Sequence, residues 1–148
     1  MAPLLTLITA TLLARLAGAF GVAYVGTWPA ALAVGLAAMF VLTGVAHFVN
    51  PLRRDLIAIV PPALPAPGLL VTVTGVLEFL GAAGLLLPDT RQAAAWCLFA
   101  LMLAMFPANV HAARMPDPPR SLTTRLGVRT VHQIVYLAAA VVVGVCGG

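Results

Sequence analysis

The sequence predicts an all-helical bundle embedded in a membrane, and two observations support this fold class. Hydrophobic residues make up 62% of the 148 residues and only 8% are charged, whereas a soluble domain is about half apolar and a quarter charged. The apolar residues also gather into runs of about 20, the length that crosses a hydrocarbon core of roughly 30 Å as a helix. A chain of this length has room for one membrane domain, residues 1–148, and for no separate soluble catalytic domain.

Five apolar runs are expected to span the bilayer. The first is interrupted by Arg15, and a turn at Trp28 and Pro29 separates it from the second. A second tight turn, at 88–91, separates the third from the fourth. A small-residue stretch at 17–19 is similar to a cleavage site, but no basic residues precede the first run, so we interpret it as a retained span. The predicted spans are 3–25, 29–49, 69–87, 93–113 and 128–146.

The segment 51–67, between the second and third spans, is expected to lie along the membrane surface. Residues 51–60 mix charged and aliphatic side chains, as a short interfacial helix does, and the prolines of 61–67 prevent that helix from continuing. Two roles stay open for this segment: a stiff surface connector, or a lid over a cavity within the membrane.

The distribution of arginines predicts the orientation of the chain. With five spans, the N-terminus and the loops 50–68 and 114–127 share one side of the membrane. That side carries Arg53, Arg54, Arg114, Arg120 and Arg125, with Arg129 at the mouth of the last span. The opposite side carries Arg91 alone. The positive-inside rule therefore places the N-terminus in the cytoplasm and the C-terminus outside.

Several stretches of the chain carry a family resemblance. They read GVAHFVNP at 44–51, IVPPALPAP at 59–67, GVLEFLGAAGLLLP at 75–88, AAW at 94–96 and FPANV at 106–110. In this order and spacing, over roughly residues 29–145, the chain resembles the DoxX-like family of small membrane proteins. The resemblance implies a four-helix membrane bundle associated with a quinone-linked thiosulfate oxidoreductase and with other membrane redox assemblies, but it implies no settled reaction. The additional N-terminal span is a departure from the family pattern.

These observations also set the expected location and partners. We expect a multi-pass protein of the cell membrane, specifically of a bacterial inner membrane. The expected partners are the lipid bilayer, a small lipophilic molecule, and either a membrane redox partner or a second copy of the chain. Nucleic acid is not an expected partner, because arginines next to membrane spans ordinarily serve orientation and contact with lipid headgroups.

Glu78 is the most informative single residue, because it is a lone carboxylate near the middle of the third span. Such a charge costs roughly 3 kcal/mol to insert, so it is usually paired, neutralised or used chemically. Arg15 has a similar expected depth, about 16 Å from the cytoplasmic end of its span against about 14 Å for Glu78. We therefore expect an ion pair between Arg15 and Glu78, which either fixes the extra helix to the bundle or sets the chemistry of the carboxylate.

The remaining polar residues of the spans gather in the cytoplasmic half and predict a cavity that opens toward the cytoplasm or the inner leaflet and ends at Glu78. Thr43 lies one turn above His47, and Pro107 frees the carbonyl group of Leu103 beside Asn109. Each histidine has an alternative role as an interhelical hydrogen-bond partner. The candidate catalytic residues are Glu78, His47 and His132, and the candidate ligand-binding residues are Arg15, Asn50, Asn109, Arg129 and Tyr136.

No motif for a metal or a nucleotide stands out. His47, Glu78 and His132 offer two imidazoles and a carboxylate, but no paired spacing on one helix supports a metal site, so none is predicted and a quinone is the one cofactor left open. Cys97 and Cys146 both lie near the external end, where a disulfide stays an alternative to two thiols that merely fill space. The chain has no Cys-x-x-Cys motif, which argues against a thiol oxidoreductase.

The sequence is compatible with three functions. The first is a membrane subunit of an oxidoreductase system that binds a quinone-like or other lipophilic ligand. The second is a cofactor-free membrane enzyme that uses Glu78 for acid–base chemistry such as isomerisation, cyclisation or epoxide opening. The third is a non-catalytic assembly factor or scaffold. A cavity of roughly 300 Å³ or more that reaches Glu78 from the cytoplasmic side would favour the first two.

Overall fold

The computed structural model describes residues 1–117, 119 and 125–147, and every regular element among them is helical. This confirms the all-helical prediction, and five of the helices are long and apolar enough to cross a membrane. The elements are α1 (Ala2–Ala19), η1 (Ala23–Val25), α2 (Trp28–Ala46), α3 (Leu52–Ala58), α4 (Pro67–Leu86), η2 (Pro88–Thr90), α5 (Arg91–Arg114) and α6 (Leu126–Cys146).

The first spanning helix is shorter than predicted. The predicted span continues to residue 25, whereas α1 ends at Ala19. Gly21 adopts a positive φ of 99°, a conformation that L residues with a side chain rarely adopt. The N–H groups of Gly21 and Val22 donate to the carbonyl groups of Gly18 and Ala17, respectively, which is the bond pair of a Schellman motif. The chain therefore turns early, and α2 begins at Trp28.

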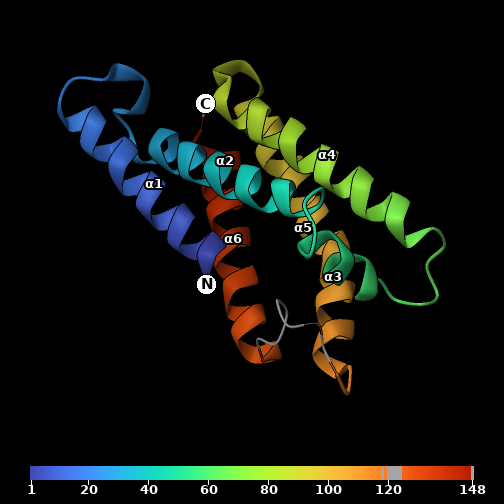
Figure 1. Ribbon diagram of the computed structural model, residues 1–148. Helices are drawn as coiled ribbons and strands as arrows, with labels where there is room; N and C mark the ends of the chain where they lie inside the picture. The colour runs from blue at the N-terminus through green and yellow to red at the C-terminus, as the bar shows by residue number, and fades with distance from the viewer. Residues whose placement is uncertain (118, 120–124, 148) are drawn as a thin grey trace.

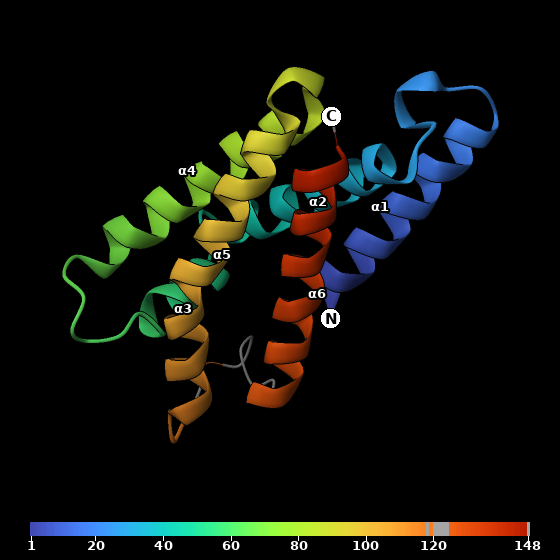
Figure 2. The same ribbon diagram turned by 180° about the vertical axis from the view of Figure 1, so that it is seen from behind.

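Four helices form a closed ring, and the fifth packs outside it. Helix α2 packs against α4 and α6, and α5 also packs against α4 and α6. Helix α1 packs mainly against α2 (Figures 1 and 2). As a result α2 is the most deeply buried helix, with small residues such as Ala31 and Ala33 fully enclosed. The core around α2 is completed by Leu85 of α4, Leu98 of α5 and Val143 of α6.

The packing of α1 on α2 depends on a close approach of the two backbones. A Cβ atom at Gly35 would lie 1.9 Å from the hydroxyl oxygen of Thr11 and 2.8 Å from the carbonyl oxygen of Leu7. Small residues at such crossings are how membrane helices gain contact without help from water. Leu7 and Thr11 are also the buried residues of α1. The rest of α1, including Leu5 and Leu13, is exposed, as a lipid-facing surface would be.

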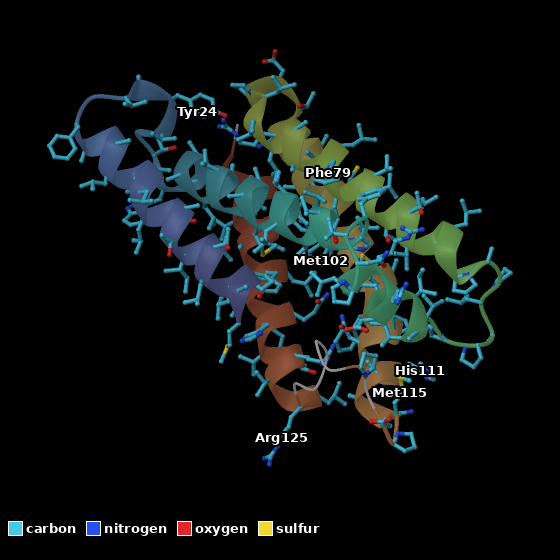
Figure 3. All side chains as sticks on the ribbon, in the orientation of Figure 1. Tyr24, Phe79, Met102, His111, Met115 and Arg125 are labelled. Atoms are coloured by element: carbon cyan, nitrogen blue, oxygen red, sulfur yellow. The ribbon has the colours of Figure 1, made fainter. Side chains whose placement is uncertain are left out.

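The two ends of the bundle differ in their side chains. We use "inner end" for the end that holds Met1, α3 and Arg114, which the arginine distribution predicts to face the cytoplasm, and "outer end" for the end that holds residues 20–27 and 87–90. Figure 3 shows His111, Met115 and Arg125 toward the inner end and Tyr24 at the outer end. The predicted surface segment after α2 is helical as expected, because α3 covers Leu52–Ala58.

Candidate functional site

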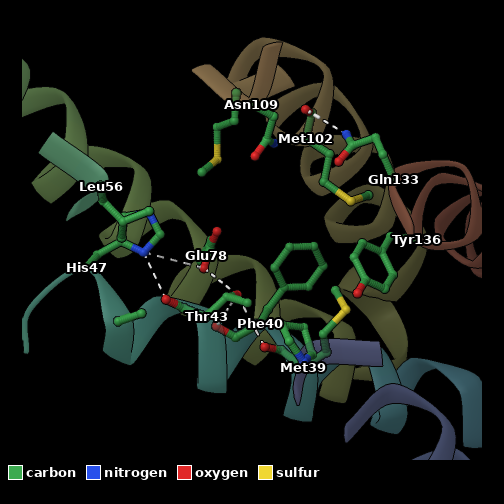
Figure 4. A pocket seen from close by; sticks show the side chains of 13 residues that line it. Met39, Phe40, Thr43, His47, Leu56, Glu78, Met102, Asn109, Gln133 and Tyr136 are labelled. Atoms are coloured by element: carbon green, nitrogen blue, oxygen red, sulfur yellow. Dashed lines mark hydrogen bonds and ion pairs between the residues drawn. The ribbon is translucent and has the colours of Figure 1, made fainter. Parts of the chain in front are cut away.

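A cavity of about 220 Å³ lies in the inner half of the bundle and reaches Glu78. Its volume is below the roughly 300 Å³ expected for a ligand of drug size, so it has room only for a small molecule or for part of a larger one. It is partly open, and its lining comes from α1, α2, α3, α4, α5 and α6. The lining residues are Pro3, Met39, Phe40, Thr43, Ala46, His47, Leu56, Glu78, Met102, Met105, Asn109, Gln133 and Tyr136 (Figure 4).

Glu78 lies on α4 with its side chain turned into the protein, and the residue is only 4% exposed. The hydroxyl group of Thr43 on α2 donates to the carboxylate oxygen Oε2 of Glu78 over 2.7 Å. Among the described residues, the second oxygen, Oε1, has no hydrogen-bond partner, and Figure 4 shows it on the side of the cavity. The carboxylate is thus held at one oxygen and is available to a ligand at the other.

His47 follows the last residue of α2 and is 3% exposed. Its Nδ1 atom lies 2.9 Å from the carbonyl oxygen of Thr43 and 3.9 Å from Oε2 of Glu78. A carbonyl oxygen only accepts hydrogen bonds, so Nδ1 carries a proton and Nε2 of the neutral ring is left as an acceptor. Burial lowers the pKa of His47, and the charge of Arg53 lowers it further against the opposing hydrogen bond to the Thr43 carbonyl group. The imidazole is therefore neutral near pH 7.

Gly75 allows α4 to approach this histidine closely. A Cβ atom at Gly75 would lie 2.6 Å from the Cβ atom of His47 and 2.8 Å from the Phe48 ring. Gly75 precedes Glu78 by one turn on the same face of α4. The close approach at Gly75 therefore sets the distance between the imidazole and the carboxylate.

Arg53 on α3 connects the inner ends of α2 and α4. Its Nη1 atom donates to the carbonyl oxygen of His47 over 2.7 Å. Its Nη2 atom donates to the hydroxyl group of Thr72 over 2.9 Å and to the carbonyl oxygen of Gly68 over 3.3 Å. A guanidinium group offers several donors in a fixed plane, which suits this three-way contact. Arg53 thereby holds α3 in place, where Leu56 lines the cavity.

Helices α5 and α6 form the opposite wall and are connected by two side-chain hydrogen bonds. Nη1 of Arg129 donates to Oδ1 of Asn109 over 3.1 Å, and Nε2 of Gln133 donates to the carbonyl oxygen of Met102 over 2.9 Å. The sequence predicts an unpaired carbonyl group near Pro107. The predicted carbonyl group is that of Leu103. Gln133 instead bonds to the carbonyl group of the preceding residue, Met102, in the part of α5 just before Pro107.

The expected ion pair between Arg15 and Glu78 is wrong. The guanidinium carbon of Arg15 lies 5.4 Å from the centroid of the Trp28 ring, a cation–π contact near the outer end. Because α1 ends at Ala19, Arg15 lies only about 6 Å from the end of its helix and not at the depth of Glu78. In the described part of the chain, the charged or titratable partner closest to Glu78 is His47.

The outer end also holds polar contacts that the sequence does not predict. Arg91 is 7% exposed and donates to the carbonyl oxygens of Leu85 and Gly147 over 3.1 and 3.4 Å. Its guanidinium group also lies over the Tyr24 ring at 5.2 Å, and the Tyr24 hydroxyl group donates to the carbonyl oxygen of Leu86. Arg91 thus satisfies carbonyl groups at the ends of α4 and α6, which are left without helical partners. We assign it a structural role.

The structure brings together some of the predicted site residues and not others. Glu78, His47, Asn109 and Tyr136 line the cavity. Arg129 contributes through its bond to Asn109. The other three candidates do not line the cavity: Arg15 lies on Trp28, Asn50 is exposed after α2, and the His132 ring lies 6.2 Å from the Tyr136 ring.

The sequence places Thr43 one turn before His47 in the predicted polar cluster, but Thr43 is not among the candidate site residues. Sequence reasoning missed Gln133, which is one turn after Arg129 and could have been found from helical spacing. It also missed the methionines at positions 39, 102 and 105, which line the cavity. Met39 is one turn before Thr43, whereas nothing in the spacing of Met102 and Met105 distinguishes them from lipid-facing residues.

Metal and thiol chemistry gain no direct support from the side-chain arrangement. Among the described residues, no group of three His, Cys, Asp or Glu side chains is arranged to hold a metal ion. Cys97 and Cys146 are both free and exposed, so the alternative of a disulfide between them does not apply to this structure.

Comparison with known proteins gives one match. The model of a family described as "Domain of unknown function (DUF8561)" matches residues 36–144. The matched region begins within α2 and ends near the end of α6, so it covers most of the four-helix ring and leaves α1 outside. No curated protein and no solved structure matches the chain.

Proposed function

We propose a ligand-binding role for this chain, which belongs to the DUF8561 family, a family whose description assigns no function. The protein binds a small lipophilic molecule in the cavity between α2, α4, α5 and α6, and Glu78 is the group that recognises it. One observation carries the proposal: a carboxylate that is 4% exposed lines a cavity and keeps one oxygen without a partner among the described residues. Such a residue is costly within a membrane unless it is used.

The walls of the cavity support a lipophilic ligand. Phe40, Met39, Met102 and Met105 provide apolar and polarisable contact, and methionines adapt to ligands of different shape. The polar groups of Asn109 and Gln133 lie on the α5–α6 side, across the cavity from Glu78 (Figure 4). A scaffold role would require a closed, fully hydrogen-bonded core. The cavity is smaller than the roughly 300 Å³ that would by itself favour a ligand, so the argument against a scaffold is the Oε1 atom of Glu78, which has no partner among the described residues.

A role as the membrane subunit of an oxidoreductase system extends this proposal. The resemblance to the DoxX-like family favours it, and a quinone headgroup would accept hydrogen bonds from the protein. A protonated Glu78, the amide of Asn109 and the hydroxyl group of Tyr136 are among the donors within the lining. The cavity is smaller than a complete quinone with its tail would need, so the tail would lie among the lipids. The chain has no evident electron carrier of its own and would depend on a partner enzyme.

The test is whether the purified chain retains a molecule in this cavity. Native mass spectrometry of the protein extracted from its host membrane is expected to show a bound organic molecule, which Glu78→Gln loses. Gln keeps an oxygen that can accept from Thr43, so the variant should fold. Ala46→Leu, which fills the cavity, is also expected to lose the molecule, whereas Ala83→Leu on the exposed face of α4 keeps it. Retention of the same molecule by both cavity variants would reject the proposal.

A second candidate function is acid–base catalysis on a lipophilic substrate, and one observation favours it. Glu78 and His47 both line the cavity, with Oε2 and Nδ1 only 3.9 Å apart, so a protonated Glu78 would supply a proton donor and Nε2 of the neutral imidazole a proton acceptor for one ligand. Incubation of the purified protein with a lipid extract of its host would then give a product of altered mass or retention time. His47→Gln and Glu78→Gln should each abolish that product, whereas His132→Gln, outside the lining, should preserve it.

A further inference from the structure

The charges around the cavity suggest what kind of ligand Glu78 selects. We propose that the ligand is a small lipophilic amine, bound as its ammonium form with an N–H group donating to Oε1 of Glu78. This inference rests on the proposed ligand-binding role and names the chemical class of the ligand. Three observations carry it: the lining of the cavity, the way the nearby cationic groups are already engaged, and the aromatic and thioether walls.

Among the described residues, the lining contains one carboxylate and no arginine, and the sequence contains no lysine. Thr43 donates one hydrogen bond to Glu78 but contributes no charge. His47 is the nearest titratable group, and its Nδ1–H group is directed to the carbonyl oxygen of Thr43, 2.9 Å away, and not to the carboxylate at 3.9 Å. An ionised Glu78 is therefore left without a balancing charge in an apolar site, and a cationic ligand would supply it.

The arginines on the neighbouring elements are directed elsewhere. Arg53 of α3 donates to the carbonyl oxygen of His47, to Thr72 and to Gly68. Arg129 of α6 donates to Asn109. Neither guanidinium group lines the cavity, and α1 and α5 contribute no titratable side chain to its lining. Tyr136 of α6 is the remaining titratable group that faces the cavity, and its phenol group carries no positive charge in either protonation state.

The rest of the cavity suits the body of such an amine. The rings of Phe40 and Tyr136 line it, and an aromatic ring attracts a cation that lies over its face. Met39 and Met102 add thioether surface for an aliphatic or aromatic group. The volume of about 220 Å³ corresponds to about seven water molecules in the liquid. It therefore suits an amine with a single ring.

The experiment compares a charged ligand with a neutral one of the same shape. Binding of benzylamine, cyclohexylamine and benzyl alcohol is measured by isothermal titration calorimetry on the full-length protein in detergent. We expect at least one amine to bind at least tenfold more tightly than benzyl alcohol. Glu78→Gln should lower the affinity for that amine at least tenfold and leave the affinity for benzyl alcohol unchanged. Asp89→Asn is the matched control, because it removes an exposed acid at the outer end and should leave both affinities unchanged.

Proton competition gives a second readout. Lowering the pH protonates the carboxylate of Glu78, so the affinity for the amine should fall. Binding of the ammonium form should then release the proton of Glu78, which is measured as a binding heat that differs between buffers of different ionisation enthalpy. Protonation of His47 would act in the same direction, so the pH dependence must persist in His47→Gln. Equal affinity for the amines and benzyl alcohol, absence of amine binding, or an unchanged amine affinity in Glu78→Gln would overturn the inference. If the amines failed to bind but the native protein still retained a neutral molecule that Glu78→Gln loses, the proposed ligand-binding role would stand and the inference of an amine ligand would not.

Discussion

Thr43 determines how the carboxylate of Glu78 is held in the bundle. Other threonines of the spanning helices, such as Thr11 and Thr74, donate along their own helix, to the carbonyl groups of Leu7 and Leu70, respectively. The Thr43 hydroxyl group lies within bonding distance of the Met39 and Phe40 carbonyl groups but makes its shortest bond, 2.7 Å, across the interface to Glu78. A lone acid in an apolar run was predictable from the sequence. Its partner was not, because helical spacing alone leaves open which faces of two helices meet.

Replacing Thr43 by Val should remove this hydrogen bond while preserving the shape of the side chain. We expect Thr43→Val to lower the free energy of unfolding by about 1 kcal/mol, the usual worth of an interhelical hydrogen bond that leaves its acceptor unpaired. The measurement is an equilibrium unfolding titration in mixed detergent micelles. Thr74→Val is the control, because Thr74 bonds only within α4. Equal losses of unfolding free energy in the two variants would show that the hydrogen bond from Thr43 to Glu78 does not stabilise the protein.

At the scale of elements, the lengths of the helices follow from hydropathy, but their ends depend on local turns. The positions of all five long helices agree with the predicted spans to within a few residues, except at the end of α1. There Gly21 and the Schellman bonds stop the helix before the apolar run is finished. This early stop moves Arg15 to the outer end and beside Trp28. The false prediction of an Arg15–Glu78 pair therefore came from a helix end and not from the charges themselves.

Arg53 is one of the side chains that hold helix α3 to the bundle, so the stability of the protein should depend on it. Arg53→Ala removes charged hydrogen bonds to the His47 carbonyl group and to Thr72, and we expect it to cost about 2 kcal/mol of unfolding free energy. Arg53→Lys should recover less than half of this loss, because an ammonium group lacks the planar fork. Thermal unfolding in detergent measures both variants.

The neighbouring arginine provides the control for this prediction. Arg54 is exposed on the same short helix, and Arg54→Ala should change the stability by less than about 0.5 kcal/mol. Because Leu56 of α3 lines the cavity, Arg53→Ala should also speed dissociation of any bound molecule. An unchanged dissociation rate together with a lowered stability would show that α3 is a connector and not a lid.

At the scale of the whole molecule, the polar groups divide between two ends with different roles. At the outer end, Arg15 and Arg91 lie over aromatic rings, and Arg91 also donates to a helix carbonyl group, an arrangement suited to the membrane–water interface. The inner half keeps Glu78 and His47 around a cavity. The charge bias of the loops predicts that this cavity opens toward the cytoplasm, so the orientation would decide which compartment supplies the proposed ligand.

Cysteine accessibility tests that orientation directly. Cys97 and Cys146 are first replaced by Ser, since both are exposed. In that background Asp89→Cys places one thiol in the exposed turn at the outer end, and Asn50→Cys places one in the exposed turn after α2 at the inner end. A membrane-impermeant maleimide applied to spheroplasts should label position 89 at once and position 50 only after lysis, because the positive-inside rule keeps the arginine-rich loops in the cytoplasm. The reverse pattern of labelling would show that the chain has the opposite orientation in the membrane and that the Glu78 cavity lies on the external side.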